Sequence, residues 1–255
     1  MVPGGKLAVI GGSGLYSMDG LHARERHLAD TPYGLTSGPV TNGYLDGEPV
    51  IFLARHGEDH SVAPHRINYR ANVWALAEAG AERILAVCST GGIGADCVPG
   101  ALVVPDQIID YTWGREHTYA EPGDPVTHTD FTHPYSPSLR SKVMDVLEGL
   151  GIRFVAGGTY AATQGPRFES AAEVSRLARD GCTIVGMTGM PEAVLARELG
   201  LAYAAICPVG NLAAGISKDE LTMDEVVGSV APVLEFVPSI VAGLLGQPGN
   251  ASSQI

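Results

Sequence analysis

Residues 159–192 decide the fold and read TYAATQGPRFESAAEVSRLARDGCTIVGMTGMPE. The pattern predicts a polar loop at 164–169, a helix over 170–178 and a buried strand over 183–187. A second loop, rich in Gly and Met, follows at 186–191. Helix and strand in alternation are typical of an α/β fold. We expect the two loops to close over one small molecule.

The alternation of strands and helices continues on both sides of this stretch. We expect strands at 6–10, 83–88, 101–104, 107–109, 154–160 and 202–207. Another strand is expected within 45–53, after a turn at Asp46–Gly47. Helices are expected at 68–79, 136–149, 191–199 and after a capping box at Thr222 and Glu225. No repeat and no break in composition divides the chain. The sequence therefore predicts an α/β fold of one domain over residues 1–246, with a central mixed β-sheet flanked by helices and a flexible tail at 247–255.

Composition and charge exclude several classes of function. The 255 residues are 45% hydrophobic and carry a net charge of −12 without any Lys or Arg block, which argues against nucleic-acid binding. The late apolar segment 223–245 contains three acidic residues and two prolines, so no membrane span is expected. With no signal peptide either, we expect a cytoplasmic protein. The four cysteines are expected to be buried free thiols: Cys88, Cys97, Cys182 and Cys207.

Three predicted strands end in loops rich in hydrogen-bond donors. The loops are GGSG at 11–14, Arg55–His56, and STGG at 89–92. Ligands in open α/β sheets bind outside the carboxyl ends of the strands, so we expect these loops to converge on a phosphate. The first loop is not a dinucleotide fingerprint, because Ser17 stands where the third glycine belongs. Leu15 likewise excludes a serine-hydrolase elbow, and no P-loop motif is present.

Two groups of histidines lie in loops, and the second lies in a long loop over 110–133. They are His56, His60 and His65, and His117, His128 and His133. Neither group has the spacing of a zinc motif. We therefore expect these histidines to bind substrate or face solvent, and we expect no metal. A loop as long as 110–133 in a compact domain is usually functional or involved in assembly.

Six motifs together identify a family. In order they are GGSGLY, ARHGEDHSVAPHRINYRAN, STGGIG, ATQGPRFES, VGMTGMPEAVLA and VGNLAAG. Over residues 7–245 the chain resembles the trimeric branch of the purine nucleoside phosphorylase and methylthioadenosine phosphorylase family, and most of all its methylthioinosine phosphorylase subgroup. The resemblance implies an enzyme without cofactor that uses inorganic phosphate as co-substrate.

The resemblance also assigns roles to individual residues. It implies a phosphate site made of Ser13, Arg55, His56, Cys88, Ser89 and Thr188. It implies a nucleoside site made of Thr90, Gly91, Phe168, Glu169, Val185, Met187, Asn211, Ala213, His128, Met223 and Val226. Asn211, Glu169 and His56 would be catalytic. His128 would come from a neighbouring subunit, so that a homotrimer shares its active sites.

Two residues favour a 6-oxopurine base. Adenine-specific members resemble one another in a D-x-D pattern, and this chain has Asn211 and Ala213 there instead. Glu169 matches the glutamate that accepts a hydrogen bond from N1–H of a 6-oxopurine. Asn211 can accept from a protonated N7 and donate to O6. A site whose buried polar groups fit one base discriminates strongly against the other.

The 5′ side of the sugar is less clearly specified. Met223, Val226 and Val227 stand where 6-oxopurine nucleoside enzymes place a histidine. An apolar wall suits a methylthio group, but these residues could equally be the core face of an amphipathic helix. The expected reaction is phosphorolysis of 5′-methylthioinosine to hypoxanthine and 5-methylthioribose-1-phosphate. The alternatives are an inosine/guanosine phosphorylase, a methylthioadenosine phosphorylase, or a nucleoside- or dye-binding protein.

Overall fold

Four parallel strands form the middle of the sheet in the computed structural model, which describes residues 6–217 and 222–246. Their order is β14 (Ala202–Leu212), β7 (Ala81–Val87), β1 (Lys6–Gly11) and β6 (Glu48–Ala54). β1 pairs with β6 on one side, Val9 opposite Phe52, and with β7 on the other, Val9 opposite Leu85. The carboxyl ends of β1, β6 and β7 therefore meet at one edge, as a ligand site in an open α/β sheet requires.

Shorter strands extend the sheet on both sides of this parallel centre. Beyond β6 lie the antiparallel strands β5 (Val40–Leu45) and β2 (His22–His27). Beyond β14 lie β8 (Thr90–Gly92), β13 (Cys182–Gly186), β12 (Thr159–Ala162) and β10 (Gln107–Asp110). β9 (Leu102–Val104) pairs with β14 and with β11 (Val155–Ala156), while β3 (Asp30–Thr31) and β4 (Gly34–Leu35) form a separate hairpin. The expected mixed sheet is confirmed.

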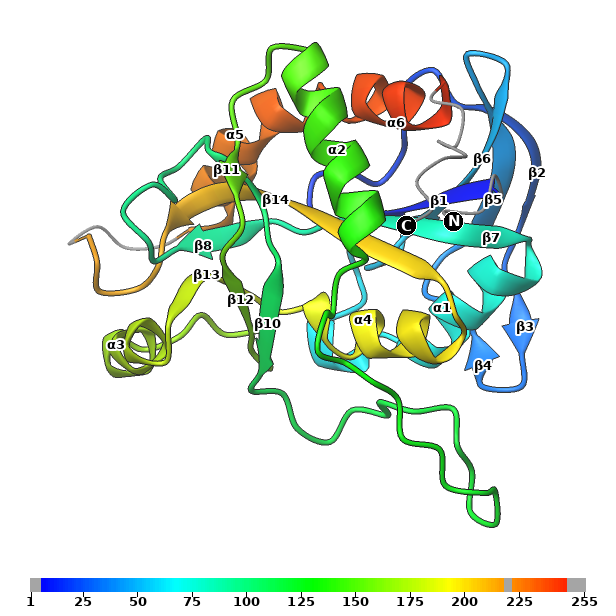
Figure 1. Cartoon of the computed structure of the whole chain (residues 1–255), viewed down its shortest axis with the longest axis horizontal. Coiled ribbons are helices and arrows are strands. Elements are labelled where there is room, and N and C mark those ends of the chain that lie inside the picture. The colour runs from blue at the N-terminus through cyan, green and yellow to red at the C-terminus, as the bar shows by residue number, and fades with distance from the viewer. Residues whose placement is uncertain (1–5, 218–221, 247–255) are drawn as a thin grey trace, which may run out of the picture.

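Helices cover both faces of the sheet (Figure 1). Ala8 and Ile10 of β1 belong to a core cluster shared with α1 (Tyr69–Glu78) and α4 (Gly189–Glu198). Leu7 and Val9, which point the other way, pack in a second cluster with α2 (Pro137–Gly149) and α6 (Val237–Gly246). α3 (Ala171–Arg179) packs against β13, and α5 (Met223–Leu234) against β14. The predicted flanking of a central sheet by helices is therefore confirmed.

Local sequence signals explain where several helices begin. α2 starts after Ser136, whose hydroxyl accepts from the Leu139 amide, with Pro137 as its first residue. α3 starts with a capping box formed by Ser170 and Glu173. The hydroxyl of Thr222 accepts from the Glu225 amide at the start of α5. These starts agree with the sequence pattern.

One strand prediction needs correction. The single strand expected at 154–160 is divided into β11 and β12, because Gly157 and Gly158 have φ values of 97° and 115° that extended strands do not allow. The expected turn at Asp46–Gly47 is confirmed: Leu45 ends β5, and the turn leads into β6. Residues 111–136, all of them described, contain neither helix nor strand, as expected of the long loop.

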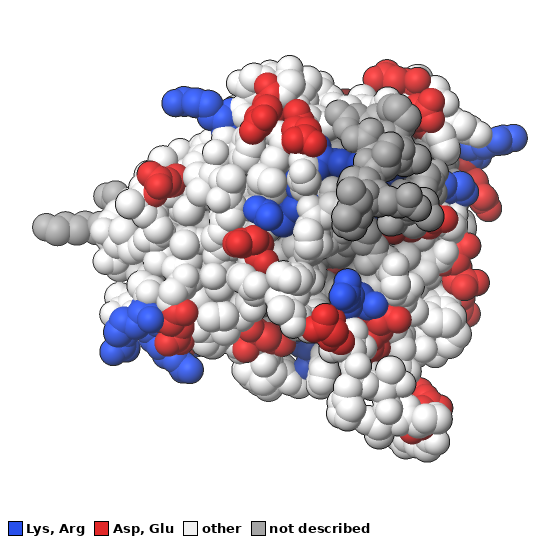
Figure 2. All heavy atoms as spheres, viewed as in Figure 1, with Lys and Arg blue, Asp and Glu red and all other residues white. Residues whose placement is uncertain are grey.

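The surface and the late apolar segment bear on the expected partners. On the face drawn in Figure 2, Lys and Arg mostly stand apart among acidic and uncharged residues, and the one small basic group, at the lower left, lies beside an acidic residue. Residues Glu225–Gly246 have the length and mean hydropathy, 1.7, of a membrane-spanning helix. However, two turn residues separate α5 from α6, and Val230, Ile240 and Leu244 are fully buried in the core. The predicted tail at 247–255 lies outside the described residues.

Candidate active site

The three donor-rich loops converge as predicted. They line a cavity of about 430 Å³ at the carboxyl edge of the sheet. The Arg55 amide donates to the Gly11 carbonyl at 2.9 Å, and the Ser89 hydroxyl donates to the Ser13 carbonyl at 3.2 Å. A larger surface groove of about 1100 Å³ lies beside β2, β5 and α1 and contains none of the predicted site residues.

Most of the predicted site residues line this one cavity. Those present are Ser13, Arg55, His56, Ser89, Thr90, Gly91, Phe168, Glu169, Val185, Met187, Thr188, Asn211, Ala213 and Val226. Cys88 does not line the cavity but lies behind it, with its sulfur 3.6 Å from Arg55 Nη2 and 3.8 Å from Thr188 Oγ1. His128 is exposed in the long loop and lies outside the cavity. The side chain of Met223 is outside the described part of the structure.

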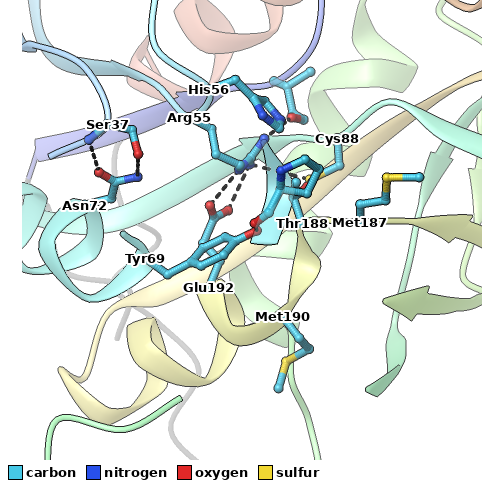
Figure 3. A network of polar contacts seen from close by, with 12 residues as sticks. Ser37, Arg55, His56, Tyr69, Asn72, Cys88, Met187, Thr188, Met190 and Glu192 are labelled. Atoms are coloured by element: carbon cyan, nitrogen blue, oxygen red, sulfur yellow. Dashed lines mark hydrogen bonds and ion pairs between the residues drawn. The ribbon is translucent and has the colours of Figure 1, made fainter. Parts of the chain in front are cut away.

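Arg55 is held by a fully buried carboxylate (Figure 3). Its Nε and Nη2 atoms donate to the two oxygens of Glu192 at 2.7 and 2.9 Å. Tyr203 donates its hydroxyl to the same carboxylate at 2.8 Å. Burial lowers the pKa of Arg55, but the Glu192 carboxylate more than offsets this and raises it well above its usual value. Arg55 is therefore a cation whose charge is already balanced inside the protein.

The remaining donors of Arg55 are also largely occupied. Nη1 donates to the Val87 carbonyl at 3.0 Å, and Nη2 approaches the Cys88 sulfur. A guanidinium has five N–H groups, so one N–H on Nη1 is left without a partner among these contacts. A Cβ atom on residue 12 would lie 3.1 Å from Nη1, so the glycine at this position leaves room for the guanidinium. Arg55 can thus offer a single N–H to an anion in the cavity.

His56 is neutral in this environment. Burial, and then the charge of Arg55, lower its pKa from 6.5 to about 4. Its Nδ1 lies 2.8 Å from the Val62 carbonyl, which can only accept, so Nδ1 carries the proton and Nε2 is an acceptor. The ring stacks on His60 at 4.7 Å between centroids. His60 in turn has Nδ1 2.8 Å from the Tyr16 hydroxyl, and burial lowers its pKa.

Two polar side chains line the cavity, one from the loop after β12 and one from β14. Glu169 accepts a hydrogen bond from the Thr163 hydroxyl at 2.6 Å, which orients its carboxylate. Asn211, on β14, donates from Nδ2 to the Leu212 carbonyl at 2.7 Å. This bond leaves Oδ1 of Asn211 available as an acceptor. Gly91 keeps the space beside Asn211 open, since a Cβ there would lie 3.3 Å from Asn211 Nδ2.

The two loops of the stretch 159–192 meet at the cavity. A Cβ on Gly165 would lie 2.5 Å from the Met187 sulfur, so only glycine allows this approach. Phe168, Met187 and Val185 add apolar surface to the wall, and Val226 and Val227 of α5 complete it. The cavity thus combines hydroxyls, one guanidinium N–H and a neutral imidazole with an apolar wall and two side chains, Glu169 and Asn211, that can bind a polar ring.

A sequence profile of the Phosphorylase superfamily matches residues 6–245. The chain belongs to this superfamily. The family resemblance inferred from the six motifs is therefore confirmed, and nearly the whole chain takes part in the match.

Relatives within the superfamily are similar over most of their length. A probable S-methyl-5′-thioinosine phosphorylase of Xanthomonas campestris pv. campestris is 52% identical over 93% of this chain and 96% of its own. A 6-oxopurine nucleoside phosphorylase of Pyrococcus furiosus is 45% identical over 87% of this chain and 85% of its own. The structure of methylthioadenosine phosphorylase from Schistosoma mansoni with adenine aligns with a TM-score of 0.89 and 31% identity, over 94% and 90% of the two chains.

Two residues of the site were not predicted from the sequence. Tyr16 lines the cavity, although it lies inside the quoted motif GGSGLY. Glu192, the partner of Arg55, lies in the motif VGMTGMPEAVLA. His60, for which substrate binding and solvent exposure were both expected, lines the cavity. The sequence position of Glu192, close to the predicted phosphate-binding residue Thr188, could have indicated its role. A carboxylate near an anion site is unfavourable unless a cation balances its charge.

Proposed function

We propose that this phosphorylase cleaves 5′-methylthioinosine with inorganic phosphate and releases hypoxanthine and 5-methylthioribose-1-phosphate. The observation that carries the proposal is the placing of Glu169 and Asn211 in one cavity with Ser13, Ser89 and Thr188. The first pair fits a 6-oxopurine, and the three hydroxyls fit an anion. Relatives named probable S-methyl-5′-thioinosine phosphorylase, at up to 52% identity, support the same substrate.

The chemistry requires a leaving group to be stabilised and a nucleophile to be positioned. A phosphate oxygen forms a bond to C1′ while the bond from C1′ to N9 breaks. The electron pair of the broken bond moves into the purine. The departing base takes up a proton at N7 from solvent; Oδ1 of Asn211 would accept a hydrogen bond from this N7–H, and Glu169 would accept from N1–H. The second N–H of Asn211 Nδ2 would donate to O6, where negative charge develops, and a donor so placed contributes about 2.7–4 kcal/mol.

Phosphate would bind without a net positive charge beneath it, because Glu192 already balances Arg55. The Ser13 hydroxyl and the free N–H of Arg55 can donate to its oxygens. The hydroxyls of Ser89 and Thr188 would donate after turning away from the Ser13 carbonyl and the Cys88 sulfur. Neutral His56 has an acceptor at Nε2, which matches the protonated oxygen of hydrogen phosphate. Directional hydrogen bonds, rather than bulk attraction, would therefore select the anion.

The 5′ substituent would contact the wall from α5. Val226 and Val227 line the cavity there, and Val226 is buried. A hydroxyl against this wall would lose a hydrogen-bond partner, whereas a methylthio group would not. Relatives named 6-oxopurine nucleoside phosphorylase, at 44–47% identity, keep inosine as the second candidate substrate.

The same proposal includes a homotrimer with shared sites. Residues 121–128 of the long loop are all exposed, and Figure 1 shows this loop extending away from the body of the molecule. Its exposed side chains include Val126, 81% exposed, and His128. An exposed apolar side chain at a projecting tip favours contact with another subunit, where His128 of a partner subunit would complete the sugar site.

The deciding experiment compares release of free base from 5′-methylthioinosine, inosine and 5′-methylthioadenosine, each with and without phosphate. We expect phosphate-dependent hypoxanthine release with the largest kcat/KM on 5′-methylthioinosine. A larger value on inosine would assign the second candidate, and no release from any nucleoside would indicate a binding protein. Glu169→Gln should reduce the preference for 5′-methylthioinosine over 5′-methylthioadenosine, and an unchanged ratio would remove Glu169 from base selection. Light scattering in solution tests the trimer.

A further inference from the structure

One arginine outside the cavity holds both loops that form its wall. Arg115 lies in the long loop, and its two terminal nitrogens donate to acceptors in three separate segments. Nη1 lies 2.6 Å from the Met190 carbonyl, 2.9 Å from the Met187 carbonyl and 3.1 Å from the Tyr69 hydroxyl. Nη2 lies 2.8 Å from the Gln164 carbonyl and 3.2 Å from the Thr163 carbonyl. Its guanidinium also lies over the Tyr69 ring, 5.4 Å from the centroid.

The bonded carbonyls belong to irregular backbone that carries site residues. Thr163 and Gln164 follow the end of β12 and precede Phe168 and Glu169. Met187 follows the end of β13 and itself lines the cavity. The β12–β13 pairing ends with the bond from the Thr163 amide to the Gly186 carbonyl at 2.8 Å, so beyond that point the position of each segment depends on other hydrogen bonds. A guanidinium supplies several charge-assisted donors in a rigid plane, which suits this task.

We infer that Arg115 is a positioning residue, which sets the distance between the base-contacting loop and the sugar-contacting loop. The inference rests on the proposed function, because it assigns these loops to base and sugar. Gly165 and Met187 touch at their closest approach, so a small movement of either loop changes the width of the cavity. Misplacing reacting groups by about 1 Å can reduce the rate roughly a hundredfold. Arg115 itself lies outside the cavity lining and acts through the carbonyls it binds.

Arg70 provides a matched control for this inference. Its Nη1 donates to Glu121 of the same long loop at 2.6 Å, and its carbonyl accepts from the Tyr119 hydroxyl. Arg70 thus attaches the long loop to α1, but the bonds of its guanidinium reach neither wall loop. Replacing Arg70 therefore loosens the long loop and leaves the bonds to Thr163, Gln164, Met187 and Met190 in place.

The test compares Arg115→Met with Arg70→Met in the full chain. We expect Arg115→Met to raise KM for 5′-methylthioinosine at least tenfold, with KM for phosphate changed less than threefold. Arg70→Met should change both KM values less than twofold. Equal effects of the two substitutions, or an unchanged nucleoside KM in Arg115→Met, would overturn the inference.

A second measurement does not depend on turnover. Hydrogen–deuterium exchange of peptides covering 163–169 and 186–190 should be at least tenfold faster in Arg115→Met than in the wild type, and unchanged in Arg70→Met. If the wild-type protein released no base, the proposed function would fail while exchange still decided the role of Arg115. Unchanged exchange in Arg115→Met would refute it. If Arg115→Met does not fold, Arg115→Lys can be used instead, since its single terminal nitrogen replaces the two terminal nitrogens of arginine. Arg115→Lys should raise the exchange rate at least threefold in the same peptides, and an unchanged rate would refute the role of Arg115.

Discussion

Replacing Glu192 with Gln should strongly destabilise the protein. The substitution keeps the size of the side chain and one oxygen, but removes the charge that balances Arg55. Both side chains are 0% exposed, so water cannot solvate the cation that remains. The new amide nitrogen would also face a donor nitrogen of Arg55, where the carboxylate now accepts at 2.7 and 2.9 Å.

The magnitude follows from the burial of the pair. Removing one partner of a buried ion pair costs about 3–5 kcal/mol, whereas replacing both partners with apolar groups is often close to neutral. We therefore expect Glu192→Gln to lower the free energy of unfolding by about 3–5 kcal/mol. The double variant Arg55→Met with Glu192→Met should recover at least about 2 kcal/mol of the summed single-variant losses, because it leaves no unpaired charge.

Urea denaturation followed by circular dichroism measures this difference, at one fixed protein concentration because assembly affects stability. The loss should persist in high salt, since a buried pair is screened little. A loss below about 1 kcal/mol for Glu192→Gln would refute the reasoning that Arg55 depends on Glu192. The reasoning would also be refuted if the double variant lost as much free energy of unfolding as the two single variants together.

Three further predictions concern the cavity. Asn211→Ala should lower kcat on 5′-methylthioinosine about 10²–10³-fold, the effect of losing one leaving-group contact, and near wild-type turnover would contradict that role. The pKa of His56 is about 4 in the folded protein and about 6.5 in the unfolded chain, so the unfolded chain binds a proton first as the pH falls from 6.5 to 4. Over that interval the free energy of unfolding of the wild type should fall by about 3 kcal/mol relative to that of His56→Asn, as measured by urea titration. Parallel pH dependences of the two proteins would disprove the assignment. Gly91→Ala places a Cβ 3.3 Å from Asn211 Nδ2 and from Val185 Cγ1, so KM for the nucleoside should rise roughly tenfold, while an unchanged KM would show that the wall yields freely.

Local signals were sufficient for much of the fold. The Ser136–Pro137 pair marked the start of α2, and Thr222 with Glu225 marked the start of α5. These features depend on residues three positions apart, so a sequence shows them directly. Strand ends followed by Gly and Ser likewise indicated where the cavity would form. The parallel order of β7, β1 and β6 then brings those ends together.

Other elements could not be predicted because their cause is distant in the chain. β2 reads HARERH and is exposed along its whole length, so it has no alternation of buried and exposed residues. β14 continues to Leu212 although Pro208 and Gly210 interrupt its pattern, because it pairs with β7, β9 and β8 in turn.

The contacts of Glu192, which is buried, and of Arg115, which is half-buried, were missed for the same reason. Glu192 meets Arg55 across 137 positions, and no property of the local sequence shows that its carboxylate is buried. Arg115 binds carbonyls 48 to 75 positions away, and carbonyls are present at every residue. Side chains with reactive groups are therefore easier to predict from a sequence than the side chains that hold them in position.

The burial of β14 suggests where divergence within this superfamily can occur. The strand is buried from Tyr203 to Gly210 and becomes half-buried at Asn211. Tyr203, which supports the ion pair, thus lies in the part where most substitutions are costly, whereas Asn211 lies at the tolerant tip. A lineage can therefore exchange Asn211, the residue proposed to bind the base, without first acquiring compensating changes in the core. Residues proposed to select the substrate and residues that stabilise the fold thus lie on the same strand, but at positions that differ in burial. Substitutions can therefore change one property without changing the other.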